Sequence, residues 1–307
     1  MKFYAPGKLL ISGEYAVLNG SKALAIPTVG YGQKLELYDS KDEVHLWQSY
    51  DPDGLWFEAR FSSDLTRILE ASNKSQAVII QQLLLYIKRF NARLFDQPLH
   101  FKTILNFSRK WGFGSSSSLI AVLSKWSQLP PFDLLDISFG GSGYDLAVAL
   151  QDQPILYQLK SPKKIVAPIY REKQAVWQSV QFKPVFADNI FLIYRNVKQN
   201  SREAIRSYRK HLPTVQQINQ ISQITESIIK CKDLSAFEKL IERHEQIIST
   251  ILQRPTIKQE FFSDYSGQIK SLGAWGGDFI MATGLQALNY FKSRGYATIL
   301  NLKDILG

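Results

Sequence analysis

The pattern of apolar and polar positions divides the chain into a strand-rich start and a helix-rich second half. In the first sixty residues, short runs of β-branched, aromatic or alternating residues are separated by Gly, Asn, Asp and Pro, which predicts an antiparallel meander. Its expected strands are residues 8–11, 23–26, 33–38, 43–47 and 55–60. Residues 76–90 then show helical periodicity, with an apolar stripe suited to packing on that sheet.

Strands and helices alternate in the rest of the chain. The expected strands are residues 100–106, 154–159, 164–169, 176–182, 190–194, 279–282 and 297–302. The expected helices are residues 116–126, 144–149, 201–210, 215–229, 234–252 and 285–291. The sequence contains no internal repeat and no long linker. We therefore expect two halves that pack tightly, with a cleft between them.

Composition indicates a globular protein without structural disulfides or a thiolate metal site. The 307 residues are 45% apolar and 12% aromatic, which is enough to fill one large or two ordinary cores. Cys231 is the single cysteine, so an internal disulfide is excluded. We expect the four histidines to lie at the surface or in the core, because they have no ligand spacing. They are His45, His100, His211 and His244.

The charge balance favours an anionic partner. Lys and Arg outnumber Asp and Glu by 37 to 27, which suits a nucleotide, a phosphorylated metabolite, nucleic acid or an acidic lipid. No helix-turn-helix, zinc-finger or RNA-binding signature accompanies the charge, so we expect no nucleic-acid partner. No window reaches the roughly 18 apolar residues of a membrane span, and the apolar run near Leu9 is too short for a signal peptide. We expect a cytoplasmic protein with no membrane partner.

Three glycine clusters carry the candidate chemistry. The first is Trp111-Gly112-Phe113-Gly114-Ser115-Ser116-Ser117-Ser118, followed by an apolar helix. Its glycines allow the backbone to approach a ligand, and its serines are expected to cap a helix whose free N–H groups and positive dipole end favour an anion. The pattern is neither a Walker A loop nor Gly-x-Gly-x-x-Gly. An ordinary glycine turn before a serine N-cap is the alternative interpretation.

The second cluster, Gly140-Gly141-Ser142-Gly143-Tyr144-Asp145, opens a short helix with an acid in its first turn. A hydrolase elbow is excluded, because Tyr144 stands where Gly-x-Ser-x-Gly requires its last glycine. The third cluster is Gly273-Ala274-Trp275-Gly276-Gly277-Asp278, with Lys270 just before it.

Together with Ala5-Pro6-Gly7-Lys8 and Gly13-Glu14-Tyr15-Ala16-Val17-Leu18, the first and third clusters resemble the motifs of the GHMP kinases in order and spacing. That family is named after galactokinase, homoserine kinase, mevalonate kinase and phosphomevalonate kinase. The segments 13–18 and 141–145 are most similar to the phosphomevalonate kinase branch, and Gly143-Tyr144-Asp145 is also similar to a smaller group of members. The resemblance implies an α+β fold of two domains with the active site in the cleft between them. Residues 1–165 would form the ATP-binding domain, which is ribosomal S5 domain 2-like, and residues 166–307 a ferredoxin-like α/β domain.

The resemblance also implies roles for single residues. The loop that wraps the ATP phosphates corresponds to Gly112, Phe113, Gly114, Ser115, Ser116 and Ser117, and the hydroxyl of Ser115 or Ser116 would complete the shell of Mg²⁺. Asp145 corresponds to the catalytic aspartate, which would orient the acceptor hydroxyl and take its proton. Lys8 corresponds to the lysine that keeps this carboxylate ionised and stabilises the oxyanion. Otherwise Asp145 would only complement a helix dipole and Lys8 would be a surface lysine.

The acceptor would be held by three further groups. The resemblance places Glu14, Tyr15, Ser142 and Gly143 around the acceptor pocket. The turn that supports the phosphate loop and the substrate corresponds to Gly273, Ala274, Gly276 and Gly277. Residues Lys198, Ser201 and Arg202 lie where phosphomevalonate kinases present polar groups to the substrate phosphate, and a solvated helix start is the alternative for them.

Three departures from the family pattern affect these expectations. Trp275 stands where the third motif has a small glycine, and we expect its bulk to fill space used for substrate or loop movement. Ser108 replaces the proline that opens the phosphate loop. The acidic magnesium ligand of mevalonate kinases has no counterpart at the matching spacing, and Asp133 and Asp136 are the nearest acids.

The leading expectation is an ATP- and Mg²⁺-dependent kinase of a small molecule, with phosphomevalonate or mevalonate as acceptor and a place in isoprenoid precursor synthesis. We expect a monomer or a homodimer. One alternative is a GHMP-fold protein that binds a nucleotide or metabolite without turnover, and another is a kinase for homoserine or a sugar. The presence of both Lys8 and Asp145 favours an enzyme, because a binding module needs no base.

Overall fold

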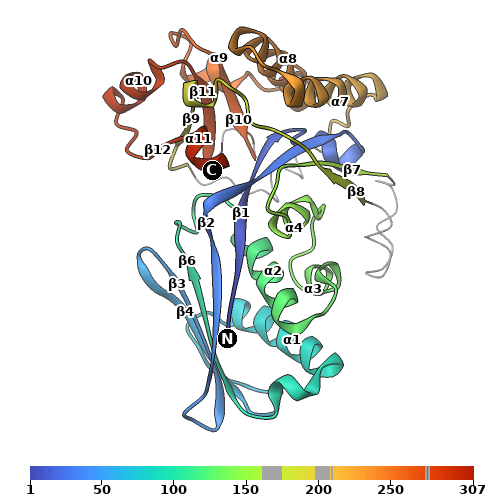
Figure 1. Ribbon diagram of the computed structural model, residues 1–307, viewed down its shortest axis with the longest axis vertical. Helices are drawn as coiled ribbons and strands as arrows, with labels where there is room; N and C mark the ends of the chain where they lie inside the picture. Colours follow the sequence, from blue (N-terminus) through green and yellow to red (C-terminus); the bar gives the residue numbers. More distant parts are fainter. Residues whose placement is uncertain (161–174, 198–207, 209, 274, 276) are drawn as a thin grey trace.

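The computed structural model describes residues 1–160, 175–197, 208, 210–273, 275 and 277–307. Two halves are stacked along the long axis of the molecule (Figure 1). The first half contains a large sheet with helices α1 to α4 on one side, and the second contains a smaller sheet with its own helices. The predicted α+β class is confirmed.

The first sheet has eight strands in the order β5-β4-β3-β6-β2-β7-β8, with β1 paired to β2. The strands are β1 (Lys2–Ser12), β2 (Ala23–Asp39), β3 (Val44–Asp51), β4 (Gly54–Ser62), β5 (Ile68–Ala71), β6 (Leu99–Leu105), β7 (Ile155–Leu159) and β8 (Ala175–Ser179). All pairs are antiparallel except β3 with β6. The simple meander is therefore wrong, since β6 lies between β2 and β3. The parallel β3–β6 pair requires a long connection, and α1 lies on that connection.

The first sheet extends past the predicted domain boundary at residue 165, because β8 still pairs with β7. The second sheet begins at Ile190. The predicted strand at residues 164–169 and the predicted helix at residues 201–210, apart from Tyr208 and Lys210, lie outside the described residues. The division of the chain into two domains remains a prediction.

Four α-helices and two short 3₁₀ turns complete the described part of the first half. They are α1 (Lys74–Phe90), α2 (Ser115–Ser127), α3 (Pro131–Asp136), α4 (Tyr144–Ala149), η1 (Ala16–Asn19) and η2 (Ala92–Phe95). Helix α1 begins at Asn73, whose side chain accepts the N–H of Gln76, and it buries Leu83, Leu84 and Ile87 in the core. Helix α2 is buried along most of its length, so its N-terminus is held firmly in place.

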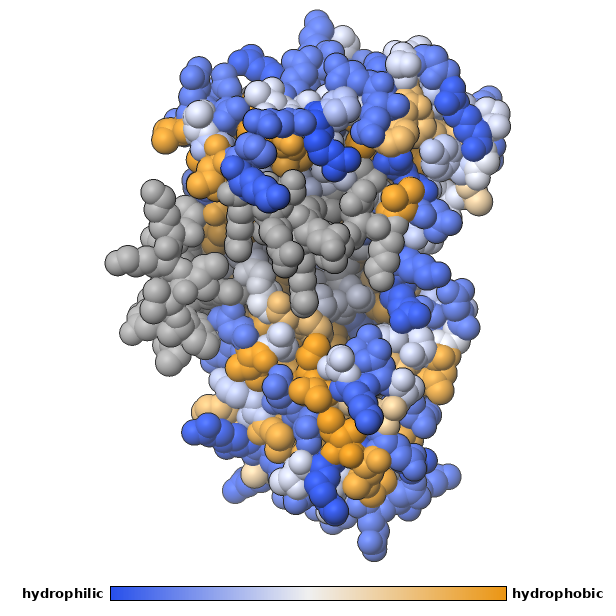
Figure 2. All heavy atoms as spheres, turned by 180° about the vertical axis from the view of Figure 1, so that it is seen from behind, coloured by the Kyte–Doolittle hydropathy of each residue, from blue (hydrophilic) through white to orange (hydrophobic). Residues whose placement is uncertain are grey.

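The second sheet is antiparallel, in the order β10-β11-β9-β12. Its strands are β9 (Ile190–Tyr194), β10 (Ile269–Leu272), β11 (Phe279–Thr283) and β12 (Ile299–Asn301). The described helices around it are α7 (Val215–Lys230), α8 (Leu234–Leu252), α9 (Ile257–Phe261), α10 (Ala287–Ser293) and α11 (Leu302–Leu306), and η4 (Ala187–Asn189) precedes β9. Helices α7 and α8 bury an apolar stripe and expose most of their charged residues, with Glu245 of α8 as a buried exception. Hydrophilic residues accordingly cover much of this half in Figure 2, where apolar residues gather over the other half.

A shared apolar core joins the two halves. It combines Leu9 and Ile11 of β1 with Leu192 of β9 and Met281 of β11. None of the helices within the described ranges is both long enough and apolar enough to span a membrane.

Candidate active site

Lys8 and Asp145, which are 137 positions apart in the sequence, form an ion pair. Lys8 lies within β1, where its backbone N–H donates to the carbonyl of Phe113 at 2.8 Å. Asp145 lies in the first turn of α4, after Gly143, whose φ of 86° favours glycine. The Lys8 ammonium is 2.5 Å from Oδ1 of Asp145, and the two side chains are 13% and 36% exposed. The pair is thus shielded on the lysine side and open to solvent on the carboxylate side.

Tyr144 is a third member of this cluster. The Lys8 ammonium lies 5.4 Å from the centre of its ring. Burial lowers the pKa of Lys8, but the Asp145 carboxylate and the Tyr144 hydroxyl together outweigh it and raise that pKa. Burial, with the nearby Asp145 charge, raises the pKa of Tyr144. Lys8 is therefore a cation and Tyr144 a neutral phenol at physiological pH. The sequence reasoning gave Tyr144 no role, and its only signal was its position beside Asp145.

The glycine-serine loop lies directly on the Lys8 side chain. Gly114 is the N-cap of α2 with φ 82°, and a Cβ atom there would lie 2.8 Å from Cγ of Lys8 and 2.7 Å from Oγ of Ser117. Only glycine fits this approach without displacement. The expected serine cap is wrong, since no side chain caps the helix. Ser117 instead donates its hydroxyl to the carbonyl of Gly114 at 2.9 Å.

The start of α2 fits an anionic ligand. The first N–H groups of a helix have no partner within it, and no side chain caps those of α2. Within the described part of the chain, the hydroxyls of Ser115 and Ser116 have no hydrogen-bond partner, and Ser116 is exposed. The free N–H groups and the two hydroxyls can donate hydrogen bonds to phosphate oxygens, and the positive end of the helix favours their negative charge.

The residues near α2 offer no acidic metal cage. Among the described residues, no group of three or more His, Cys, Asp or Glu side chains is placed to hold a metal ion. Asp133, the nearest acid to the missing magnesium ligand in the sequence, accepts a hydrogen bond of 3.4 Å from Tyr86.

The third glycine cluster contacts the glycine-serine loop. Gly112 has φ 69°, and a Cβ atom there would collide with the carboxylate of Asp278. The ring of Phe279, the next residue, stacks on Phe113 with centroids 5.1 Å apart. Gly273 has φ 68°, and Gly277 is buried. The other two predicted residues of this turn, Ala274 and Gly276, lie outside the described residues.

Trp275 packs into the interior. It is 3% exposed and belongs to the core of the second half. Its backbone N–H donates to the Tyr15 hydroxyl at 2.6 Å, and its indole N–H donates to the carbonyl of Pro255 at 3.3 Å. Through its backbone N–H, Trp275 therefore connects the third cluster to the segment 13–18.

The residues predicted to bind the acceptor occupy different environments. Glu14 and Tyr15 are buried, at 3% and 7% exposure. The carbonyl of Ser142 accepts the Tyr157 hydroxyl at 2.7 Å, and Gly143 is the N-cap of α4. The remaining three, Lys198, Ser201 and Arg202, lie outside the described residues. Acceptor binding by all seven remains a prediction.

Glu14 belongs to a buried ionic network that the sequence analysis missed. Lys270 of β10 lies 2.6 Å from Glu14 and 3.4 Å from Glu245 of α8. The neighbouring His244 accepts the backbone N–H of Gly13 through Nε2 at 3.1 Å. Burial raises the pKa of Glu14, raises that of Glu245 to about 7 and, together with the Lys270 charge, lowers that of His244 well below its usual value. His244 is a neutral residue of the core, and the core was one of the two places expected for the histidines.

Solved structures with the same fold include three small-molecule kinases. Phosphomevalonate kinase from Streptococcus pneumoniae, in complex with phosphomevalonate and AMPPNP, superposes with a TM-score of 0.70 at 17% identity, covering 98% of this chain and 99% of that one. Mevalonate kinase from Methanococcus jannaschii gives a TM-score of 0.67 at 16% identity and 98% and 97% coverage. Galactokinase from Lactococcus lactis, complexed with galactose, gives 0.62 at 11% identity and 98% and 92% coverage. No protein-family model and no curated protein matches the sequence.

These structures confirm at the level of the fold the resemblance that the glycine motifs indicated. All three kinases belong to the GHMP superfamily, and each superposes on 98% of the chain. The fold of this chain is therefore that of the GHMP kinases, over nearly its whole length.

Proposed function

We propose that the chain is an ATP-dependent kinase that transfers the γ-phosphoryl group to a hydroxyl or phosphate group of a small molecule, with phosphomevalonate and mevalonate as the leading acceptors. The observation that carries the proposal is the Lys8–Asp145 pair of 2.5 Å, placed beside the free N-terminus of α2 by the contact of Gly114 with Lys8. A protein that only bound a nucleotide would have no use for an aspartate and a lysine in this position. The fold and the kinase relatives support the proposal.

The start of α2 would hold the triphosphate. Phosphoryl transfer needs little covalent chemistry and depends on alignment and charge neutralisation. The free N–H groups of α2 and the hydroxyls of Ser115 and Ser116 would bind phosphate oxygens, and one of these hydroxyls would also ligate Mg²⁺. When bound, Mg²⁺ would neutralise charge on the phosphates. Gly112 and Gly114 keep the backbone close enough for these contacts.

Asp145 and Lys8 would act on the acceptor. For a hydroxyl acceptor, Asp145 would take the proton as the oxygen attacks, and the Lys8 cation would stabilise the oxyanion. A phosphate acceptor is already anionic at neutral pH, so the proton transfer is not needed, and Lys8 would carry most of the effect. The ring of Tyr144 lies beside the Lys8 ammonium.

The proposal is tested by measuring ATP consumption with Mg²⁺ and a panel of mevalonate, phosphomevalonate, homoserine and galactose. With the preferred acceptor, we expect Asp145→Ala to lower kcat by about 10² to 10⁴ when that acceptor is a hydroxyl, the range typical of a general base, and to leave nucleotide affinity nearly unchanged. Asp152→Ala removes an exposed aspartate seven residues further on and serves as the matched control, for which we expect wild-type activity.

Two results would contradict the proposal. If no acceptor of the panel raises ATP consumption above the rate without acceptor while nucleotide still binds, the sensor or binding protein is the better interpretation. If homoserine or galactose is the preferred acceptor, the reaction type stands and the mevalonate assignment is wrong.

A further inference from the structure

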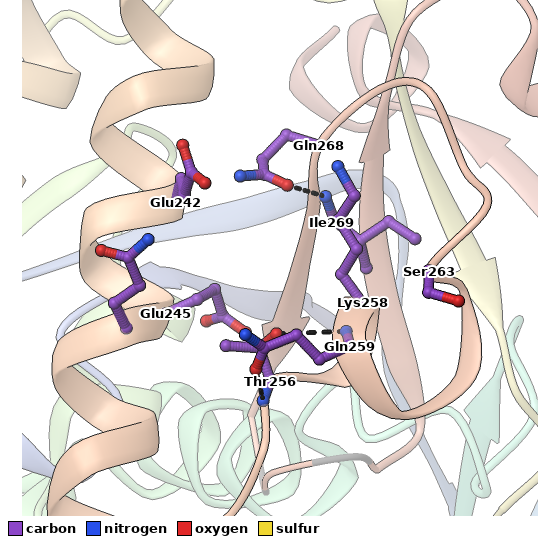
Figure 3. Close-up of a pocket in the computed structure, with 9 residues that line it drawn as sticks. Glu242, Glu245, Thr256, Lys258, Gln259, Ser263, Gln268 and Ile269 are labelled. Carbon is purple, nitrogen blue, oxygen red and sulfur yellow. Dashed lines mark hydrogen bonds between the residues drawn. The ribbon is translucent and has the colours of Figure 1, made fainter.

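A polar pocket separates α8 from the segment that contains α9 and the start of β10. Its volume is about 230 Å³, and Figure 3 shows its lining. The residues around it are Glu242, Glu245, Gln246, Thr256, Lys258, Gln259, Ser263, Gln268 and Ile269. None of them belongs to the three glycine clusters or to the Lys8–Asp145 pair. The pocket is therefore a feature separate from the candidate active site.

One carboxylate that faces this space has no partner in the described part of the chain. Glu242 has neither an ion-pair nor a hydrogen-bond partner within the described residues, and Glu245 is buried deeper on the same helix. The one cation of the lining, Lys258, donates to the carbonyl of Gly267 at 2.7 Å. Lys258 therefore does not pair with Glu242. A positively charged group of a ligand would be favoured beside the Glu242 carboxylate.

Gln268 provides an unused donor on the opposite wall. It is 9% exposed, and its Oε1 accepts the N–H of Ile269 at 3.2 Å. Its Nε2 has no acceptor among the described residues, and in Figure 3 this nitrogen points across the pocket toward Glu242. An amide N–H₂ group that faces a pocket without an acceptor can donate to a ligand. A ligand oxygen at this point would satisfy it.

Glu245 adds a reason for a cationic ligand. It shares Lys270 with Glu14, so that two buried carboxylates face one ammonium group at 3.4 and 2.6 Å. Two buried acids with one cation between them leave an uncompensated negative charge when both are ionised. A second cation in the pocket would balance that charge from the other side of Glu245.

We propose that this pocket is a second ligand site, which binds a molecule of about amino-acid size through an ammonium group at Glu242 and an oxygen atom at Gln268 Nε2. The volume is below the roughly 300 Å³ at which drug-sized ligand sites begin, so the ligand is small. Glu245 forms the deep end of the site and connects it through Lys270 to Glu14.

The test is a calorimetric or NMR titration of the full chain, without nucleotide, using L-serine, L-aspartate, 4-aminobutyrate and ethanolamine as probes. At least one probe is expected to bind saturably. Its analogue with a hydroxyl in place of the ammonium group, such as glycerate for serine, is expected to bind at least tenfold more weakly. This readout does not depend on kinase activity, so its failure is distinguishable from failure of the proposed function.

Two variants locate the binding. Glu242→Gln removes an exposed charge without disturbing the core, and we expect it to weaken the bound probe at least tenfold. Glu260→Gln makes the same change at an exposed position of α9 outside the pocket, and its affinity is expected to stay within twofold of wild type. The proposal is overturned if no probe binds, or if the bound probe has the same affinity for wild type and Glu242→Gln.

Discussion

The ammonium group of Lys270 lies 2.6 Å from a carboxylate oxygen of Glu14, although 256 positions separate the two residues in the sequence. Their side chains are 1% and 4% exposed. The pair fixes the turn after β1, which belongs to the first half, to strand β10 of the second half. The segment 13–18 is therefore positioned by a buried charge interaction in addition to apolar packing.

Replacing Lys270 by Met removes the cation from this network and leaves Glu14 and Glu245 facing each other in the interior. Breaking a buried ion pair in this way costs about 3–5 kcal/mol. We expect Lys270→Met to lower the free energy of unfolding by that amount, measured by urea denaturation at neutral pH.

The matched control is Lys303→Met. Lys303 pairs with Asp188 at 3.0 Å, but the side chains are 65% and 63% exposed, and such surface pairs contribute about 0–1 kcal/mol. Equal losses of stability in the two variants would show that the Lys270–Glu14 pair has no special structural role.

The buried network also predicts how stability depends on pH. The pKa of Glu245 is raised to about 7, so its contribution is full below the unfolded value of about 4.3 and is lost as the pH rises through about 7. The pKa of His244 is lowered, so its contribution is present above about 6.5 and is lost as the pH falls. Glu14 acts in the same direction as Glu245, and Lys270 is the cation that faces all three. Between about pH 5 and 6.5 the opposing effects should give a shallow profile.

Two variants separate these effects. Glu245→Gln removes one of the two contributions that fall with pH, so between about pH 5 and 6.5 the slope of the free energy of unfolding should be more positive than in wild type, by up to about 1.4 kcal/mol per pH unit. His244→Gln keeps an acceptor for the Gly13 N–H and removes the contribution that rises with pH, so its slope should be more negative than that of wild type over the same interval. Urea denaturation across this interval measures both slopes, and parallel profiles for the two variants would refute the assignment.

Local patterns of the sequence predicted most of the elements and failed where pairing is distant. Helix α8 has the predicted bounds of residues 234–252, because its apolar periodicity is uninterrupted. The two strands predicted at residues 23–26 and 33–38 are one continuous strand, β2. The prediction divided it because Pro27 and Gly30 are residues that often end a strand. The register shift between Pro6 and Gly7 of β1 accommodates this irregular part of β2.

The same limit applies to the candidate site. Glycine motifs and family resemblance were sufficient to name Lys8, Asp145 and the loop around Gly114. The network around Glu14 has no local signature, because Lys270 and His244 come from different elements more than 200 residues away. Burial then changes the chemistry of ordinary Glu and His residues, and only the folded structure determines that burial.

Tyr15 connects the segment 13–18 with the third glycine cluster through its hydroxyl. A phenylalanine removes this hydroxyl and keeps the ring. Tyr15→Phe leaves the N–H of Trp275 without its acceptor, at a position where Trp275 is 3% exposed. A buried donor without a partner costs about 1–3 kcal/mol, and we expect that loss in urea denaturation. Tyr38→Phe, which removes a hydroxyl bonded to Glu36 at the surface, is the control and should cost about 0.5 kcal/mol or less. A larger loss in the control would contradict the role given to Tyr15.

Gly114 allows the most direct separation of backbone strain from site geometry. Its φ is 82°, and that of Gly295, which has open space around it, is 85°. An alanine at either position should lower stability by roughly 1 kcal/mol because of the left-handed backbone. Only Gly114→Ala also pushes against Lys8 and Ser117, so only this variant should weaken nucleotide binding and lower kcat, by about tenfold or more for a displacement of 1 Å. Stability is measured by denaturation, and affinity by titration with a non-hydrolysable ATP analogue. If Gly295→Ala impaired nucleotide binding as much as Gly114→Ala, the contact between the loop and Lys8 would not be what shapes the site.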